Sequence, residues 1–134
     1  MARSYRNRKA LGTRAERELV KKFWEINWAC IRSAGSGSQH YPSPDILVGN
    51  GSRRLAIEVK VTSADKKYFS AEEIRGLKYF SAKFGAEPWV AIKFQGRNWV
   101  FLTLEDLEDT GKSKAASKEI AGRRGLSFED LTET

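Results

Sequence analysis

The spacing of hydrophobic residues predicts a helix over residues 13–27. Thr13 and Glu16 have the spacing of a capping box, in which each side chain accepts a hydrogen bond from the other residue's backbone N–H group. Apolar residues then recur at helical intervals, and basic residues occupy positions between them. The apolar set is Leu19, Val20, Phe23 and Ile26, and the basic set is Arg14, Arg17, Lys21 and Lys22. The helix is therefore expected to turn one face to a core and to carry positive charge on the other.

A second helix is expected from Ser70 to about Phe84, again opened by a capping box, here between Ser70 and Glu73. Strands are predicted where apolar residues alternate with others or are β-branched: residues 28–31, 45–48, 54–62, 89–94 and 99–103. Polar turns at 49–52 and 95–98 make two hairpins of these strands. The order of elements predicts an α/β domain with a mixed central β-sheet flanked by helices.

The remaining segments are interpreted as connections and ends of a single domain, residues 1–134. Residues 1–9 are expected to be a mobile basic arm, and residues 33–44 a loop rich in Gly, Ser and Pro. A connection is predicted over 63–69 and a short acidic helix over 104–109. Residues from about 110 to 134 are polar with few apolar groups, which predicts a weakly ordered tail.

Composition and charge narrow the class of protein. The chain carries 24 Lys and Arg against 17 Asp and Glu, a net charge of +7, and residues 1–32 alone hold nine basic and three acidic residues. This distribution indicates a polyanion partner, of which nucleic acid is the commonest. No apolar run approaches the roughly 20 residues of a membrane span. The single cysteine and single histidine exclude an intramolecular disulfide and a zinc site built on several such ligands, and they fit a cytoplasmic location.

Chemistry is concentrated at Asp45, Glu58 and Lys60. Glu58 and Lys60 lie two positions apart in one predicted strand, so their side chains leave the same face. Asp45 begins the neighbouring strand of the hairpin and is expected beside Glu58. Two convergent carboxylates suit Mg²⁺, a hard cation that polarises phosphate oxygens, and a nearby lysine can stabilise developing charge. The pattern predicts phosphodiester hydrolysis; the alternative is an ordinary solvated face with an ion pair.

The chain resembles the archaeal Holliday junction resolvases, within the restriction-endonuclease-like nucleases. The resemblance covers roughly residues 10–107 and rests on four segments in that family's order. They are the G-x-x-x-E-R sequence of residues 12–17, the R-x-x-x-S-G-S sequence of 32–38, Pro44-Asp45-Ile46, and Ile57-Glu58-Val59-Lys60. Two departures are Glu72-Glu73, where members often have Gln, and Gln39-His40-Tyr41, where they often have basic residues.

The resemblance implies a restriction-endonuclease-like fold, a homodimer, and paired nicking of four-way junction DNA with Mg²⁺, or Mn²⁺ in its place. It implies acidic active-site residues that hold the metal, a catalytic lysine, and a serine loop at the scissile phosphate. These are Glu16, Asp45 and Glu58 for the metal, Lys60 as the lysine, and Ser36 and Ser38 in the loop. DNA contacts are expected from Arg14, Arg17 and Arg32, and from Lys66 and Lys67 beside Tyr68-Phe69. The host compartment would be the cytoplasm of an archaeal or a virus-infected cell.

The sequence leaves two other functions open. Another nuclease of the same superfamily would cut linear duplex or repair DNA. A non-catalytic DNA-binding module would bind junctions without needing Asp45 or Glu58. A homodimer has a physical argument of its own, because one small chain with one site cannot nick two symmetry-related strands at once.

Overall fold

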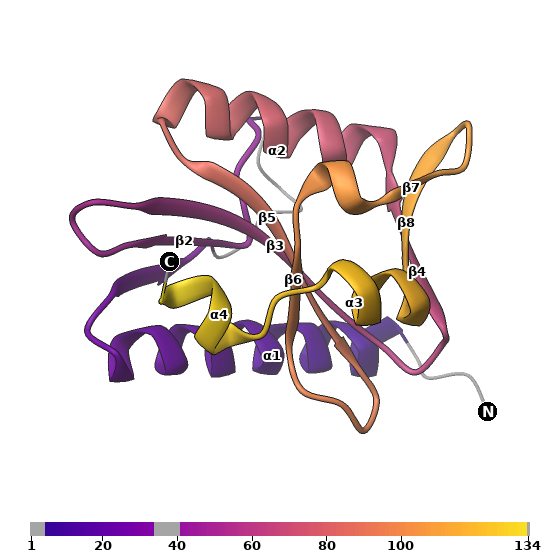
Figure 1. Cartoon of the computed structure of the whole chain (residues 1–134), viewed down its shortest axis with the longest axis horizontal. Coiled ribbons are helices and arrows are strands. Elements are labelled where there is room, and N and C mark those ends of the chain that lie inside the picture. Colours follow the sequence, from indigo (N-terminus) through magenta and orange to yellow (C-terminus); the bar gives the residue numbers. More distant parts are fainter. Residues whose placement is uncertain (1–4, 34–40, 134) are drawn as a thin grey trace.

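A five-stranded mixed sheet forms the centre of the molecule (Figure 1). The computed structural model describes residues 5–33 and 41–133. The strands, in spatial order, are β1 (Ala29–Arg32), β2 (Ile46–Gly49), β3 (Arg54–Thr62), β5 (Glu87–Phe94) and β6 (Val100–Leu102). All neighbours are antiparallel except β3 and β5, which are parallel and joined through a helix. The predicted fold class is confirmed.

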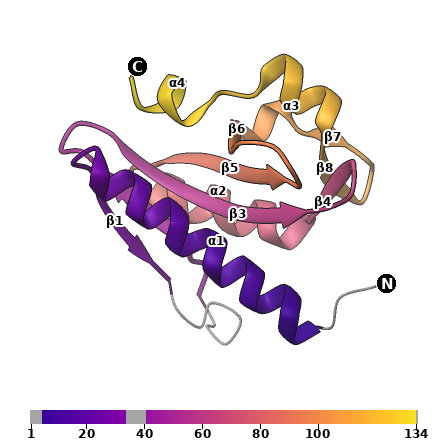
Figure 2. The same cartoon turned by 90° about the horizontal axis from the view of Figure 1, so that it is seen from below.

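Two helices cover opposite faces of this sheet. Figure 2 shows α1 (Tyr5–Glu25) in front of β3 and α2 (Ala71–Phe84) behind it. The alternation in β3 explains the arrangement: Leu55 and Ile57 pack in the cluster of α1, whereas Ala56 packs in the cluster of α2. Glu58 and Lys60 share the parity of Ala56 and therefore leave the strand on the α2 side.

The first helix begins eight residues earlier than predicted, so Thr13 lies inside it and is not an N-cap. The preceding residues are mainly strong helix formers, and the cost of Gly12, about 1 kcal/mol, does not interrupt them. Five residues of the expected basic arm, 5–9, are the first turns of α1, and residues 1–4 lie outside the described residues. The helix ends at Glu25 because Asn27 adopts a left-handed conformation (φ 70°).

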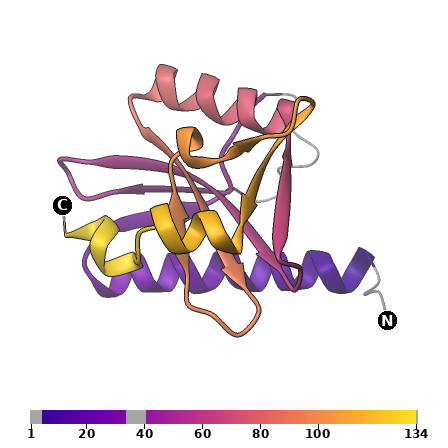
Figure 3. The ribbon, with the colours of Figure 1, turned by 45° about the vertical axis from the view of Figure 1, so that its right-hand side comes forward.

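The expected weakly ordered tail is wrong, because residues 108–132 form regular structure. Glu108–Asp109 (β7) and Ser113–Ser117 (β8) join Lys66–Ser70 (β4) in a second sheet of order β4-β8-β7 (Figure 3). The predicted connection over 63–69 is thus largely strand. The acidic helix expected at 104–109 is reduced to a 3₁₀ turn, Leu104–Asp106.

Two short helices, α3 (Lys118–Arg124) and α4 (Phe128–Thr132), complete the chain. Phe128 and Leu131 of α4 are buried in the same core as Phe23 of α1. The rings of Phe23 and Phe128 meet edge to face, with centroids 4.9 Å apart. Few apolar residues suffice to order this segment because the core supplies their partners.

Candidate active site

Asp45 and Glu58 meet across the β2–β3 hairpin. Ile46 is paired with Ile57, so the residue before Ile46 lies opposite the residue after Ile57. One carboxylate oxygen of Asp45 (Oδ2) accepts a hydrogen bond from the backbone N–H of Val59 at 2.8 Å, which fixes its direction. The two carboxyl groups lie close enough for each to influence the pKa of the other. The hairpin therefore delivers the juxtaposition that its sequence spacing suggested.

Both carboxyl groups hold a proton more tightly than they would in water. Loss of water around Glu58 is the main cause that raises its pKa to about 9, and the negative charge of Asp45 adds to it. Burial likewise raises the pKa of Asp45, although the Val59 N–H group and Lys60 oppose the shift. Two acids this close in poor contact with water form a site that favours either a shared proton or a cation.

Lys60 lies beside this pair, but its hydrogen bond goes to Glu73, which the sequence had not indicated as a functional residue. Its ammonium nitrogen (Nζ) donates to the Glu73 carboxylate (Oε2) at 2.6 Å. Burial raises the pKa of Glu73, but hydrogen bonds from Lys60 and Ser70 outweigh it, and the net pKa is lowered. Glu73 therefore carries a charge, and a third carboxylate adjoins the site.

Glu16 reaches the edge of the same site from α1. Its pKa is raised, first by burial and then by the negative charge of Asp45. Arg32 of β1 donates from Nε to the Glu16 carboxylate at 2.9 Å. Glu16 is thus held by Arg32 rather than by a helix cap, and Arg32, an expected DNA contact, is itself held in an ion pair.

The described part of the chain brings together two acids of the expected three. Within it, no cluster of three or more Asp, Glu, His or Cys side chains is arranged to hold a metal ion. Asp45 and Glu58 are adjacent, whereas Glu16, at the edge of the site, is paired with Arg32. Ser36 and Ser38, expected at the scissile phosphate, lie outside the described residues.

Comparisons with known proteins show the family of this chain. The model of the archaeal Holliday junction resolvase (Hjc) family matches residues 7–134. The chain belongs to that family. It is 45% identical to the crossover junction endodeoxyribonuclease Hjc of Archaeoglobus fulgidus over 105 residues, 78% of this chain and 77% of that protein. The Hjc of Methanocaldococcus jannaschii is 35% identical over 81% of this chain and 77% of its own length.

A solved structure extends the likeness to three dimensions. The crystal structure of the Archaeoglobus fulgidus Hjc, described as a Holliday junction resolvase from an archaeal hyperthermophile, matches with a TM-score of 0.84. The match has 39% identity and covers 90% of this chain and 98% of that one. The resemblance inferred from the sequence is confirmed, and it extends to the C-terminal segment, which the motifs had not covered.

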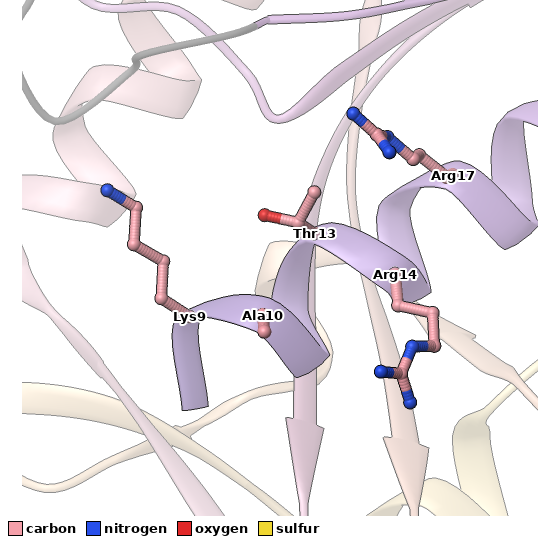
Figure 4. Close-up of a pocket in the computed structure, with 5 residues that line it drawn as sticks. All are labelled: Lys9, Ala10, Thr13, Arg14 and Arg17. Carbon is pink, nitrogen blue, oxygen red and sulfur yellow. The ribbon is translucent and has the colours of Figure 1, made fainter. Parts of the chain in front are cut away.

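The expected DNA contacts of this resolvase-family chain fall into two groups. Arg14 and Arg17 are exposed on α1 and line a basic groove with Lys9, Ala10 and Thr13, whose side chains project from successive turns of the helix (Figure 4). Lys66 instead pairs with Glu108 of β7 at 3.2 Å, and Lys67 is half-buried in β4. The structure thus favours α1 over β4 as a surface for phosphates.

Glu73 is the functional candidate that sequence reasoning missed. It stands 13 residues after Lys60, beyond an intervening strand, so no local periodicity joins the two. The only signal was its place where members of the family often have Gln.

Proposed function

We propose that this chain is a structure-selective endonuclease that resolves four-way (Holliday) junctions by paired, metal-dependent hydrolysis of phosphodiesters. The observation that carries the proposal is the partly buried Asp45–Glu58 pair with Lys60 beside it, in a chain of the Holliday junction resolvase family. A partly buried pair of acids costs stability unless a cation joins it, so the presence of this pair argues for a chemical role.

The residues present fit Mg²⁺, with Mn²⁺ able to replace it. The donors are carboxylate oxygens, which a hard cation prefers, and two carboxylates leave coordination positions for water and phosphate. Asp45 and Glu58 would hold the ion, and Glu16 would be added if Arg32 released it. When bound, the ion supplies Lewis-acid activation of the phosphate and of water.

The other groups act on the DNA strand. Lys60 carries a positive charge toward the phosphate and stabilises charge that develops there. Ser36 and Ser38 are proposed to contact the scissile phosphate, on the strength of the R-x-x-x-S-G-S sequence that they belong to. Arg14 and Arg17, in the groove of α1, are proposed to bind the phosphates of a duplex arm. Arg32 would join them when its ion pair with Glu16 opens.

We further propose a homodimer, which the apolar face beyond α2 supports. On its side of the central sheet, α2 packs mainly on β3 and β5. The same face of β1 and β2 therefore extends beyond the helix. Ile31 of β1 is 64% exposed there, paired with Leu47, and Phe84 of α2 is 49% exposed and stacked on Phe80. Such a patch on a two-fold axis would place two active sites on symmetry-related strands.

A location in the cytoplasm completes the proposal, in keeping with the free, buried Cys30. Among the described residues, no helix is both long and apolar enough to cross a bilayer.

The test is cleavage of a synthetic four-way junction with Mg²⁺, run beside linear duplex of the same sequence. We expect paired nicks in the junction and an intact duplex. Asp45→Asn and Glu58→Gln should each abolish cleavage while junction binding remains or tightens, because each removes an acid that repels phosphate when it is ionised. Cutting of the linear duplex would favour another nuclease of the superfamily. An intact junction with both Mg²⁺ and Mn²⁺ would favour a non-catalytic binding module.

A further inference from the structure

The carboxylate of Glu73 is fixed at two points. Ser70 caps α2, with its hydroxyl accepting from the Glu73 N–H group at 3.0 Å. In return Glu73 Oε1 accepts from the Ser70 N–H group, also at 3.0 Å. With one oxygen committed to the cap, the second oxygen (Oε2) is directed at Lys60.

Two other acidic side chains lie near Lys60. Glu58 leaves the same face of β3, Asp45 lies opposite Glu58, and the charges of both act on the ammonium. Its hydrogen bond nonetheless goes to Glu73, and the nitrogen also lies 5.8 Å from the centre of the Phe69 ring. Strand β4 and the first turn of α2 therefore hold the Lys60 ammonium, while the Asp45–Glu58 pair stays within reach of its charge.

We propose that Glu73 is a positioning residue for the catalytic lysine: it holds the Lys60 ammonium beside the acid pair, so that Asp45 and Glu58 stay free for a cation. A lysine side chain is long and flexible, and without an anchor its ammonium would fall between the two acids and compete with the metal. The inference rests on the proposed function, since it gives Lys60 its catalytic role. Glu73 would then have two roles, because it also belongs to the capping box that begins α2.

The decisive measurement is single-turnover cleavage of a four-way junction by a matched set of variants. Glu73→Ala should lower the cleavage rate about 10- to 100-fold, the usual effect of losing a group that orients a catalytic residue. Its junction affinity, measured without metal, should stay within about twofold of the wild type. Glu73→Gln should fall between the two, because its amide oxygen can still accept one hydrogen bond.

Two controls separate positioning from capping and from charge. Ser70→Ala removes the hydroxyl of the capping box but leaves the Glu73 carboxylate, and Glu72→Ala removes an exposed charge from the same turn. Both should cleave at nearly the wild-type rate. If Ser70→Ala lowers the rate as much as Glu73→Ala does, Glu73 acts only as a cap and the proposal is overturned.

A double-variant cycle tests whether Glu73 works through Lys60. In a Lys60→Ala background, Glu73→Ala should cause no further loss of rate. A full additional loss would overturn the positioning role. If Lys60→Ala cleaves normally, there is no catalytic lysine to position, and the inference fails while the resolvase function stands. If the wild type does not cleave junctions at all, both fall together.

The ion pair between Lys60 and Glu73 can also be observed directly, without metal or substrate. In ¹H–¹⁵N spectra of the ammonium groups, the Lys60 signal of the wild-type protein should be protected from exchange by its bond to Glu73. It should disappear in Glu73→Ala and remain in Glu72→Ala. Its persistence in Glu73→Ala would show that Lys60 is held by other groups.

Discussion

At the scale of single residues, the site is defined by charges that the fold brings together at a cost. Glu58 binds its proton far more tightly in the folded chain than in the unfolded one, with a pKa of about 9 against an ordinary 4.5. A raised acid pKa means that the native state holds more protons, so stability falls as pH rises from about 4.5 to about 9. The residue proposed for catalysis is therefore also a source of instability at neutral pH.

Glu58→Gln should remove this loss. In EDTA at pH 8 the variant is expected to melt at least about 3 °C above the wild type, and the difference should shrink toward pH 4.5. Thermal unfolding across this pH range measures it. A variant that is less stable than the wild type at pH 8 would mean that Glu58 stabilises the fold as an anion.

Mg²⁺ should have the same stabilising effect by another route. A cation bound by Asp45 and Glu58 in the folded state alone raises the melting temperature of the wild type at pH 8. The increase should vanish in Glu58→Gln and Asp45→Asn. An equal increase in all three proteins would place the binding elsewhere.

At the scale of elements, the short helix α4 stabilises more than its length suggests. Phe128 packs on Phe23, and Arg53 at the start of β3 reaches both the Glu87 carboxylate and the backbone carbonyl of Leu131. These contacts join the C-terminal segment to α1, β3 and β5. The segment is thus an integral part of the core rather than an appendage.

Phe128→Ala should accordingly destabilise the protein by about 3–5 kcal/mol, the usual range for losing a buried aromatic ring. Denaturant unfolding measures this, with Glu129→Ala on the exposed side of the same helix as the control. A loss below about 1 kcal/mol would mean that α4 is held loosely.

At the scale of the whole molecule, the net charge of +7 is unevenly placed, and α1 carries the groove that we propose for DNA. Figure 2 shows α1 and α3 on either side of β3, and Arg123 and Arg124 of α3 are exposed. Binding of a polyanion should therefore depend on where a charge is removed, and not only on how many are removed.

The double variant Arg14→Ala with Arg17→Ala should weaken junction binding. The slope of log affinity against log salt concentration should also decrease in magnitude by about two, one for each phosphate that an arginine no longer neutralises. Arg123→Ala with Arg124→Ala removes the same charge from α3 and should leave that dependence nearly unchanged. Titrations at several salt concentrations compare them. Equal effects of the two pairs would mean that only net charge matters.

The proposed dimer makes its own prediction at this scale. Phe84→Asp should shift the protein to a monomer in analytical ultracentrifugation, because it places a charge in the apolar patch. Tyr68→Asp, at an exposed aromatic on β4 in the other sheet, is the matched control and should not. A wild-type protein that is already a monomer would contradict the dimer.

Elements whose interacting residues are close in the sequence could be predicted before the structure was known. The alternation in residues 54–62 sets the two faces of β3, the turn at 49–52 brings Asp45 opposite Glu58, and the Ser70–Glu73 spacing starts α2. In these cases neighbouring residues supply each other's partners. These local patterns predicted the mixed α/β fold and the juxtaposition of Asp45 and Glu58, and the motifs identified the family.

Contacts between residues far apart in the chain became known from the folded molecule. It paired Lys60 with Glu73 and Glu16 with Arg32, and it ordered the C-terminal segment against Phe23 and through the β4–β8 pairing. No periodicity records such contacts, because burial against a distant surface stabilises even a polar segment with a few apolar side chains. For the same reason the starting point of α1 and the position of Glu73 beside Lys60 had to come from the folded molecule.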